Sequence, residues 1–296
     1  MTSPVARRYA RAALRNASAL VLAKALKADA DQADTQEDRQ HLRRKAKRAE
    51  ACAVTAVTRT HWNDDGTTSV ITYNRRGCRL RLCPQCEARR AARERQRVRD
   101  IFAATFTTDP EARVLFVTLT SRNRPIAEAG AMFKDHEAAL KRLWRQRRIV
   151  GATLGQLTAL EIDVRGTRDN PEAGVHSHSA VFVAPGYFED QRYLTQRQWA
   201  EHWQAALGSD YRPIVDVRVI RDAHGATDRG AVMNAARELA KYVTDPKGLI
   251  HMSETGLSAD PRVVGALTRA LHRRRLLRFD RIIADAAKRV RKAEGR

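Results

Sequence analysis

Two histidines separated by a single residue, His176 and His178, are the clearest candidates for chemistry in this sequence. They lie in an apolar stretch, residues 175–184, that is predicted to be a strand, where alternate side chains point to one face. Glu161, in another predicted strand over residues 158–164, adds a carboxylate if the two strands pair through a hairpin loop. Two imidazoles and a carboxylate suit Mg²⁺, Mn²⁺ or a similar ion. For an isolated His-x-His pair, a shared polar sheet face is the simpler explanation, and Glu161 alone could be a solvated strand residue.

A second candidate group is an acid and a phenol four residues apart, Glu238 and Tyr242, with Lys241 beside the phenol. Residues 232–244 are predicted to be a helix, so the two side chains share a face and could reach one phosphorus atom. A phenol with its usual pKa of about 10 is a poor nucleophile. It becomes useful where a metal ion polarises a phosphodiester. Without other evidence, the tyrosine would be interpreted as a packing residue and the glutamate as a surface residue. The two histidines make a catalytic role of the pair a stronger hypothesis.

Four cysteines, all in one early segment, form a third group: Cys52, Cys78, Cys83 and Cys86. An intracellular compartment would keep them reduced, so metal binding is favoured over disulfides. The spacing is compatible with a tetrahedral zinc site in which Cys83 and Cys86 form the close pair, and His61 is a possible substitute for Cys52. The alternative is a chance cluster of buried cysteines. Four protein ligands would leave no open position, so the predicted zinc site is structural.

The charge of the chain favours a polyanionic partner. Lys and Arg total 55 against 34 Asp and Glu, which gives a formal net charge of +21. Nucleic acid is the first candidate, and a predicted basic helix over residues 87–106 places Arg89, Arg90 and Arg93 where they could contact phosphates. The sequence has no run of 18 or more apolar residues and no apolar signal peptide after Met1, so we expect no membrane association and a cytoplasmic location.

Alternating strand and helix patterns surround the two histidines, Glu161 and Tyr242. We expect an α/β (α+β) domain on a mainly antiparallel sheet, with the histidine strand central and the Tyr242 helix packed beside it. The other elements are expected as strands over residues 114–120 and 214–221 and helices over residues 129–146 and 195–207.

The predicted organisation has four segments. Residues 1–50 form a basic helical arm that is solvated and partly disordered, because its charged end has no apolar face wide enough for a core. Residues 51–108 form a small zinc module, including a hairpin, followed by the basic helix. Residues 109–252 form the catalytic domain, and residues 253–296 form a basic helical tail.

These residues, in this order, resemble the replication initiators of small rolling-circle plasmids, a branch of the HUH endonucleases. The resemblance extends over about residues 52–247 of 296. The matching segments are Arg81-Leu-Cys-Pro-Gln-Cys86, Phe116-Val-Thr-Leu-Thr120, Glu161, His176-Ser-His178 and Glu238-Leu-Ala-Lys-Tyr242.

The resemblance implies an HUH-type catalytic domain and a mechanism. Tyr242 would attack the scissile phosphodiester at the plasmid origin, forming a 5′-phosphotyrosine link and freeing a 3′-hydroxyl. His176 and His178 would hold the divalent ion, and Glu238 would act as general base for water at termination. Host helicase and polymerase would be partners. Ser177 departs from the bulky apolar residue usual between the histidines, which predicts weaker packing behind the sheet. The basic residue after the tyrosine falls later, at Lys247, and is a candidate DNA contact.

Two other functions are compatible with parts of this pattern. A transposase or a conjugative relaxase would also use His-x-His and a tyrosine, but relaxases usually place the tyrosine first, and single-strand transposases often carry a second tyrosine where this chain has Glu238. A non-enzymatic, zinc-containing DNA-binding protein would explain the charge and the cysteines and leave the other motifs unexplained. A covalent protein–DNA band on a denaturing gel would distinguish an enzyme from a binder.

Overall fold

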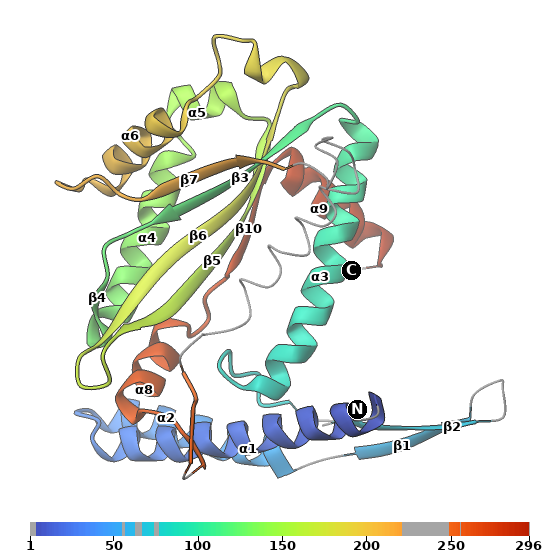
Figure 1. The fold of residues 1–296 in the computed structure, drawn as a ribbon, viewed down its shortest axis with the longest axis vertical. Coiled ribbons are helices and arrows are strands. Elements are labelled where there is room, and N and C mark those ends of the chain that lie inside the picture. The colour runs from blue at the N-terminus through green and yellow to red at the C-terminus, as the bar shows by residue number, and fades with distance from the viewer. Residues whose placement is uncertain are drawn as a thin grey trace. The chain divides into compact units, whose positions relative to one another are not determined.

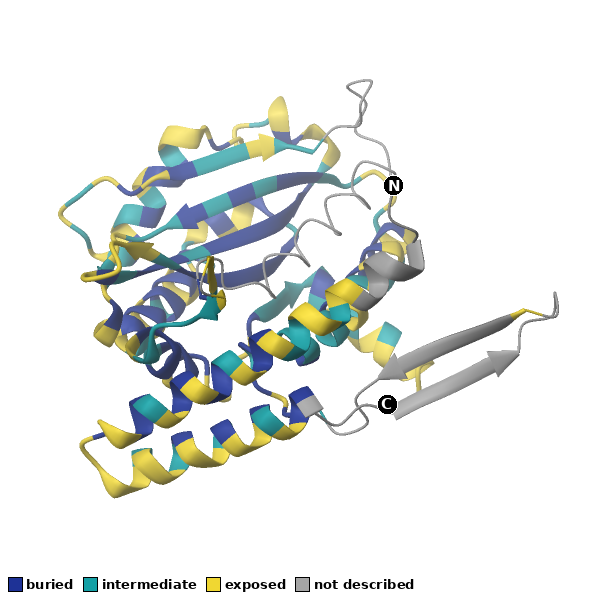
Figure 2. Ribbon diagram, turned by 60° about the horizontal axis from the view of Figure 1, so that its bottom comes forward, coloured by how far each residue is buried: buried dark blue, intermediate teal, exposed yellow. Residues whose placement is uncertain are grey.

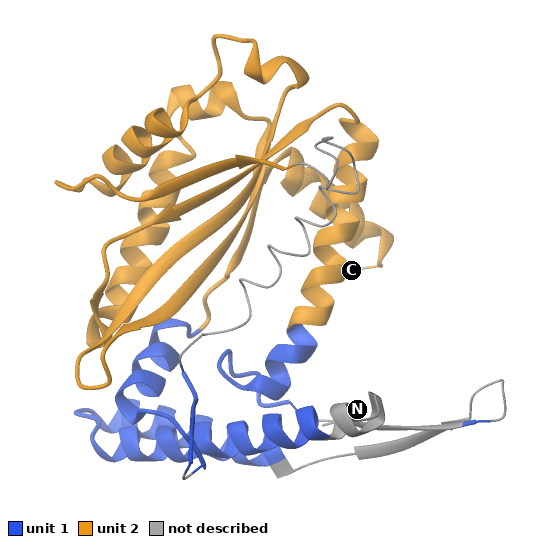
Figure 3. Ribbon diagram, in the orientation of Figure 1, with its two compact units in different colours: residues 1–90, 247–272 blue, residues 91–246, 273–296 orange. Residues whose placement is uncertain are grey.

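Two compact units make up the protein, as a computed structural model shows (Figure 3). The first contains residues 1–90 and 247–272, and the second contains residues 91–246 and 273–296. These units divide the chain differently from the four segments expected from the sequence, because the tail contributes to both. The structure describes residues 4–54, 57–62, 67–73, 77–220, 249–254 and 256–295. The helix predicted over residues 232–244 lies outside these ranges.

The first unit consists mainly of helices. Its hairpin of β1 and β2 is antiparallel, as the sequence predicts. Helix α3 begins here, directly after the cysteine-rich loop. The elements are α1 (Pro4–Asp31), α2 (Gln36–Val54), β1 (Val57–Trp62), β2 (Thr68–Tyr73), the start of α3 (Pro84–Thr108), β8 (His251–Ser253), β9 (Gly256–Ser258) and α8 (Pro261–Ala270).

Helices α1 and α2 pair along a narrow apolar seam, where the sequence predicts a solvated arm without a core. Leu22 and Leu26 of α1 are fully buried, as are Leu42 and Ala46 of α2. Small buried side chains such as Ala46 allow close approach of the two helices, so a narrow apolar stripe is sufficient for packing. The outward faces remain exposed, as Figure 2 shows.

The second unit is built on an antiparallel sheet with strand order β10-β5-β6-β3-β7, to which β4 adds by pairing with β6 (Figure 1). The histidine strand, β6, is central, which confirms the prediction. All pairings among these described strands are antiparallel. The strands are β3 (Arg113–Thr120), β4 (Arg124–Pro125), β5 (Gly155–Gly166), β6 (Pro171–Val183), β7 (Val215–Val219) and β10 (Leu277–Arg281).

Helices cover both faces of this sheet. Helices α4 and α6 lie behind it, on the face of Ser177, while Phe102 and Phe106 of α3 pack against Phe182 of β6 on the face of the histidines, with ring centroids 5.2 and 5.5 Å apart. Helices on both faces explain why nearly every residue of β6 is buried, the polar ones included. The elements are η1 (Ile126–Glu128), α4 (Ala129–Leu143), α5 (Arg147–Ala152), η2 (Pro185–Phe188), α6 (Gln196–Leu207) and α9 (Ile282–Ala293).

The sequence predicts a purely helical C-terminal tail, but part of the tail is a strand. This strand, β10, forms an edge of the sheet. Its residues 277–281 pair with residues 155–159 of β5. A buried acid on α4, Glu137, binds Arg274 at 2.8 Å and also Arg278 of β10. Two arginines therefore neutralise one buried carboxylate and tie the tail to the unit.

Replacing Phe182 with alanine should destabilise the second unit strongly. This ring is fully buried between the sheet and α3, so its removal leaves a cavity and should lower the free energy of unfolding by about 3–5 kcal/mol. Urea unfolding followed by the fluorescence of Trp199 and Trp203, both buried in this unit, measures the change. Ile214→Ala, at a side chain 75% exposed, is the control and should change stability by no more than about 0.5 kcal/mol. Equal effects of both variants would contradict the described core.

Candidate functional site

The hairpin of β5 and β6 determines which side chains face one another. Glu161 pairs directly with His176, and Ala159 pairs with His178. On the other side of β6, Thr118 of β3 pairs with His178. The strands are joined by only four residues after Gly166, whose positive φ of 76° suits glycine. The predicted pairing is confirmed, and the connecting turn consists of residues 167–170.

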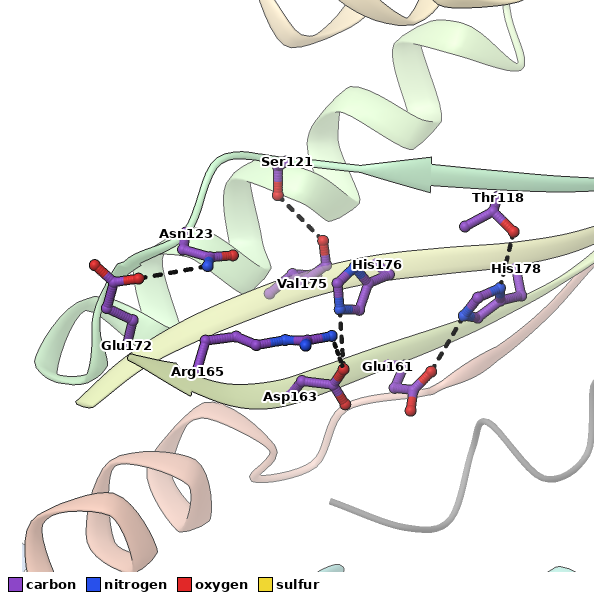
Figure 4. Close-up of polar contacts among 10 residues, drawn as sticks. All are labelled: Thr118, Ser121, Asn123, Glu161, Asp163, Arg165, Glu172, Val175, His176 and His178. Carbon is purple, nitrogen blue, oxygen red and sulfur yellow. Dashed lines mark hydrogen bonds and ion pairs between the residues drawn. The ribbon is translucent and has the colours of Figure 1, made fainter. Parts of the chain in front are cut away.

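Each histidine contacts a different carboxylate on β5 (Figure 4). His176 Nε2 lies 3.2 Å from Asp163 Oδ2, and His178 Nε2 lies 3.1 Å from Glu161 Oε2. The two ring centroids are 6.5 Å apart. All four side chains come from alternate positions and share one face of the sheet. Glu161 therefore reaches the histidine diagonal to its own strand partner.

Thr118 completes the contacts of His178. Its Oγ1 lies 3.1 Å from Nδ1 of the ring, and the Phe116 ring lies 5.7 Å away between centroids. Because a carboxylate accepts at Nε2, the Nε2 atom carries the proton when the ring is neutral, and Nδ1 then accepts from the threonine hydroxyl. Both nitrogens of His178 are thus held in place by neighbouring strands.

Asp163 is the residue of this group that the sequence analysis did not single out. It lies two positions after Glu161 on β5, so period-two alternation was the signal that could have identified it. Burial opposes its ionisation, but the hydrogen bond and charge of His176 and the charge of Arg165 outweigh this, and the pKa of Asp163 is lowered. Its second oxygen, Oδ1, is buried and has no hydrogen-bond partner among the described residues.

These donors fit a hard divalent ion. Two imidazole nitrogens and two carboxylates are the ligand types that such ions accept, and Asp163 Oδ1 is an unsatisfied acceptor at the site. Neighbouring ligands of an octahedral Mg²⁺ lie about 3 Å apart, which matches the two nitrogen–oxygen distances. The groups nevertheless form two pairs and not one tight cluster. Side-chain rotation would be needed for both imidazoles to reach one ion.

The four cysteines, in contrast, do form one tight cluster. Their sulfur atoms all lie within 4.8 Å of one another. The sulfur of Cys86 is 3.7 Å from that of Cys52 and 3.5 Å from that of Cys78, and the sulfur of Cys83 is 3.8 Å from that of Cys52. A tetrahedral zinc ion with Zn–S bonds of about 2.3 Å has sulfur–sulfur edges of about 3.8 Å. The cluster could therefore hold a metal ion.

Three elements bring the cysteines together in the first unit. Cys52 lies in the last turn of α2, Cys78 and Cys83 lie in the loop before α3, and Cys86 lies in the first turn of α3. All four are buried. Hydrogen bonds from Cys78 and Cys83 lower the pKa of the Cys86 thiol. Cys52 itself completes the cluster, and the side chain of its alternative, His61, lies outside the described residues.

The predicted DNA contacts differ in their surroundings. Arg93 is exposed on α3, whereas Arg90 binds Glu87 at 2.5 Å and the carbonyl oxygen of Leu80 at 3.4 Å. Arg89 is half-buried. Arg90 therefore supports the cysteine-rich loop, and Arg93 is the residue of the three most available to a phosphate. The remaining candidates, Glu238, Tyr242, Lys241 and Lys247, lie outside the described residues.

The chain is similar to known replication proteins over most of its length. The Rep_1 family, described as replication protein, matches residues 70–295. A "Protein rep" of Lactiplantibacillus plantarum is 33% identical over 56% of this chain and 52% of its own length. A "Protein rep" of Streptococcus pneumoniae serotype 2 is 29% identical over 77% of this chain and 67% of its own, and a "Replication protein" of Staphylococcus aureus is 28% identical over 64% of this chain and 79% of its own.

The chain thus spans between about half and two thirds of the length of the first two of these relatives. No solved structure matches it significantly. Among the helices that the structure describes, none combines the length and apolar character required to cross a lipid bilayer.

Cys83→Ser should remove a bound metal ion from the first unit. The wild-type protein, purified without chelators, is expected to contain about one equivalent of metal per chain, since four thiolates complete a coordination shell. Mass spectrometry of the dialysed protein gives the amount and the element. His61→Ala is the control and should keep the metal, because four sulfur atoms suffice. A wild-type protein without metal, or a Cys83→Ser protein with a full equivalent, would contradict the assignment.

Proposed function

The chain belongs to the Rep_1 family of replication proteins, and we propose that it initiates rolling-circle replication of a plasmid by nicking one strand at the origin. The observation that carries this proposal is the pairing of His176 with Asp163 and of His178 with Glu161 on one face of the central strand. Such a group of imidazoles and carboxylates is suited to a metal-assisted reaction of a phosphodiester.

His176, His178, Glu161 and Asp163 would hold a Mg²⁺ or Mn²⁺ ion. When bound, this ion supplies positive charge that polarises the scissile phosphate and stabilises the charge developing on its oxygens. Each histidine would hold the ion through a ring nitrogen that bears no proton, so the single proton of the neutral ring would lie on the other nitrogen. In His178 the proton would lie on Nδ1, which would donate a hydrogen bond to Thr118 Oγ1 and so fix the orientation of the ring.

Tyr242 is the proposed nucleophile. Its phenolic oxygen attacks the phosphorus, a bond from that oxygen to phosphorus forms, and the bond from phosphorus to the 3′-oxygen breaks. The phenol loses its proton, and the departing 3′-oxygen gains one to become a free hydroxyl. The products are a 5′-phosphotyrosine and a 3′-end that a polymerase can extend. No external oxidant, reductant or nucleotide is needed, because one phosphate ester replaces another.

Glu238 is proposed to end the cycle. Placed four residues before Tyr242 in a predicted helix, its carboxylate would share the face of the phenol and accept a proton from water. That water attacks the phosphotyrosine, and the tyrosine leaves. A single tyrosine can then both start and finish a round, without the second tyrosine of single-strand transposases.

Zinc is the ion proposed for the four cysteines, since four thiolates at tetrahedral spacing suit it and leave no site for substrate. Plasmid origin DNA is the proposed partner, bound through phosphate contacts from Arg93, Arg89, Lys241 and Lys247, in keeping with the net charge of +21. Host helicase and polymerase would then act on the nicked DNA in the cytoplasm.

Tyr242→Phe should abolish nicking and adduct formation while origin binding stays nearly intact. The variant lacks only the attacking oxygen, so the phosphate contacts are unchanged. Labelled single-stranded origin DNA, incubated with Mn²⁺ and analysed on a denaturing gel, reports both the nick and the covalent band. Tyr211→Phe, which keeps its ring over Arg122, is the matched control and should still form the adduct. Cleavage by Tyr242→Phe at the wild-type rate would refute the proposal.

Glu238→Ala should cleave but release its product slowly. The first step uses the tyrosine and the second uses the acid, so the covalent protein–DNA adduct should accumulate relative to wild type. A time course of adduct and released DNA on the same type of gel separates the two steps. Glu254→Ala, which removes an acid that is exposed on the surface of the first unit, serves as control. Normal release by Glu238→Ala would indicate that this residue has no role in termination.

A further inference from the structure

A histidine outside the motif, His136 of α4, lies directly behind the histidine strand. It is only 1% exposed, and its Nε2 lies 3.1 Å from Ser177 Oγ, the residue between the two histidines. Its Nδ1 lies 3.2 Å from Ser121 Oγ at the end of β3. Its ring packs against Trp203 of α6 in an edge-to-face arrangement, with centroids 5.0 Å apart. His136 thus links a helix to two neighbouring strands.

The directions of these hydrogen bonds follow from the partners. Ser121 Oγ donates to the carbonyl oxygen of Val175 at 3.3 Å, so it accepts from Nδ1–H of His136. Nε2 then accepts from the Ser177 hydroxyl. Burial, with a smaller effect of His176, lowers the pKa of His136 to about 3, so the ring is neutral near pH 7. One tautomer satisfies every polar atom of the group.

The two contacts hold β6 on both sides of His176. Ser177 follows His176 and is bound directly, and Val175 precedes it and is bound through Ser121. The side chain of His176 itself points to the opposite face, toward Asp163. A hydrogen-bonded bridge on the covered face therefore fixes the backbone from which the metal-facing imidazole projects.

We propose that His136 is a positioning residue for the divalent-ion site, acting through Ser177 and Ser121 on the strand that carries His176 and His178. This inference rests on the proposed function of those histidines as metal ligands. Two apolar side chains in place of His136 and Ser177 could fill the same volume at little cost in stability. They would form no directional hydrogen bond, so they would not hold the β6 backbone at one position along the strand axis. The departure at Ser177, which predicts weaker packing behind the sheet, is compensated by this bridge.

Binding of Mn²⁺ to the full-length protein, with its cysteine site loaded with zinc, tests the proposal. Titration followed by electron paramagnetic resonance measures the Kd without requiring catalysis. His136→Leu and Ser177→Ala should weaken Mn²⁺ binding by about tenfold, the loss typical when a group supporting a metal ligand is removed. Leu140→Ala is the matched control. Leu140 lies on the same helix, one turn further, and is equally buried at 1% exposure.

The control variant separates an effect on the position of the metal ligands from a general loss of protein stability. Leu140→Ala should lower Tm to a similar extent yet leave the Kd within about twofold, because an apolar side chain donates no hydrogen bond to the strand that carries the two histidines. If His136→Leu does not fold, Ser177→Ala and Ser121→Ala test the same bridge with a smaller change of volume. Wild-type Mn²⁺ affinity in the folded bridge variants, or an equal loss in Leu140→Ala, would overturn the proposal.

A further variant distinguishes this failure from failure of the proposed function. His176→Ala with His178→Ala should abolish Mn²⁺ binding at this site. If that double variant binds Mn²⁺ as the wild type does, the metal site itself is wrongly placed. If the double variant loses binding and the bridge variants do not, the metal site stands and only the role of His136 is refuted.

Discussion

The register between β5 and β6 is the constraint on which the rest of the site depends. Because side chains alternate along a strand, the pairing of Glu161 with His176 places two acids and two imidazoles on one face. A slip of one residue would turn one set toward the other face and separate the acids from the histidines. The four-residue turn after Gly166 and the apolar residues on both faces fix this register. The chemistry of the face is therefore determined by a hairpin and not by a mobile loop.

Burial of both faces imposes a second requirement, since every polar group on β6 needs a partner. On the covered face, Ser177 pairs with His136, and Ser179 pairs with Thr158 at 2.8 Å. A buried hydroxyl left unpaired there would cost about 1–3 kcal/mol, so each hydroxyl is matched by a partner. The same bonds are directional, which a purely apolar face would not be. The serines of β6 thus contribute to packing on the covered face and also fix the backbone from which the two histidines project on the opposite face.

Local patterns in the sequence predict the histidine strand, its pairing with the Glu161 strand and the cysteine cluster, because alternation and spacing are properties of neighbouring residues. Asp163 follows from the same alternation once the pairing is known. The bridge from His136 to Ser177 spans 41 positions and joins a helix to a strand, so no local pattern indicates it. The edge strand at residues 277–281 carries charges at three of its five positions, and the alternation of Leu277 and Phe279 with charged residues is too short to stand out in a basic tail, for which the sequence predicts helix. The seam between α1 and α2 depends on their mutual packing and is hidden by the surrounding charge.

Two buried carboxylates dominate the electrostatics of the histidine face. Glu161 and Asp163 are 7% and 9% exposed, and two buried carboxylates on one face repel each other. Arg165 and the imidazoles offset part of this repulsion, yet Asp163 Oδ1 has no partner among the described residues. A divalent cation bound here, as proposed, would offset the charge of both acids and give Asp163 Oδ1 a partner. The electrostatics of this face, as well as the types of its side chains, thus support the proposed metal site.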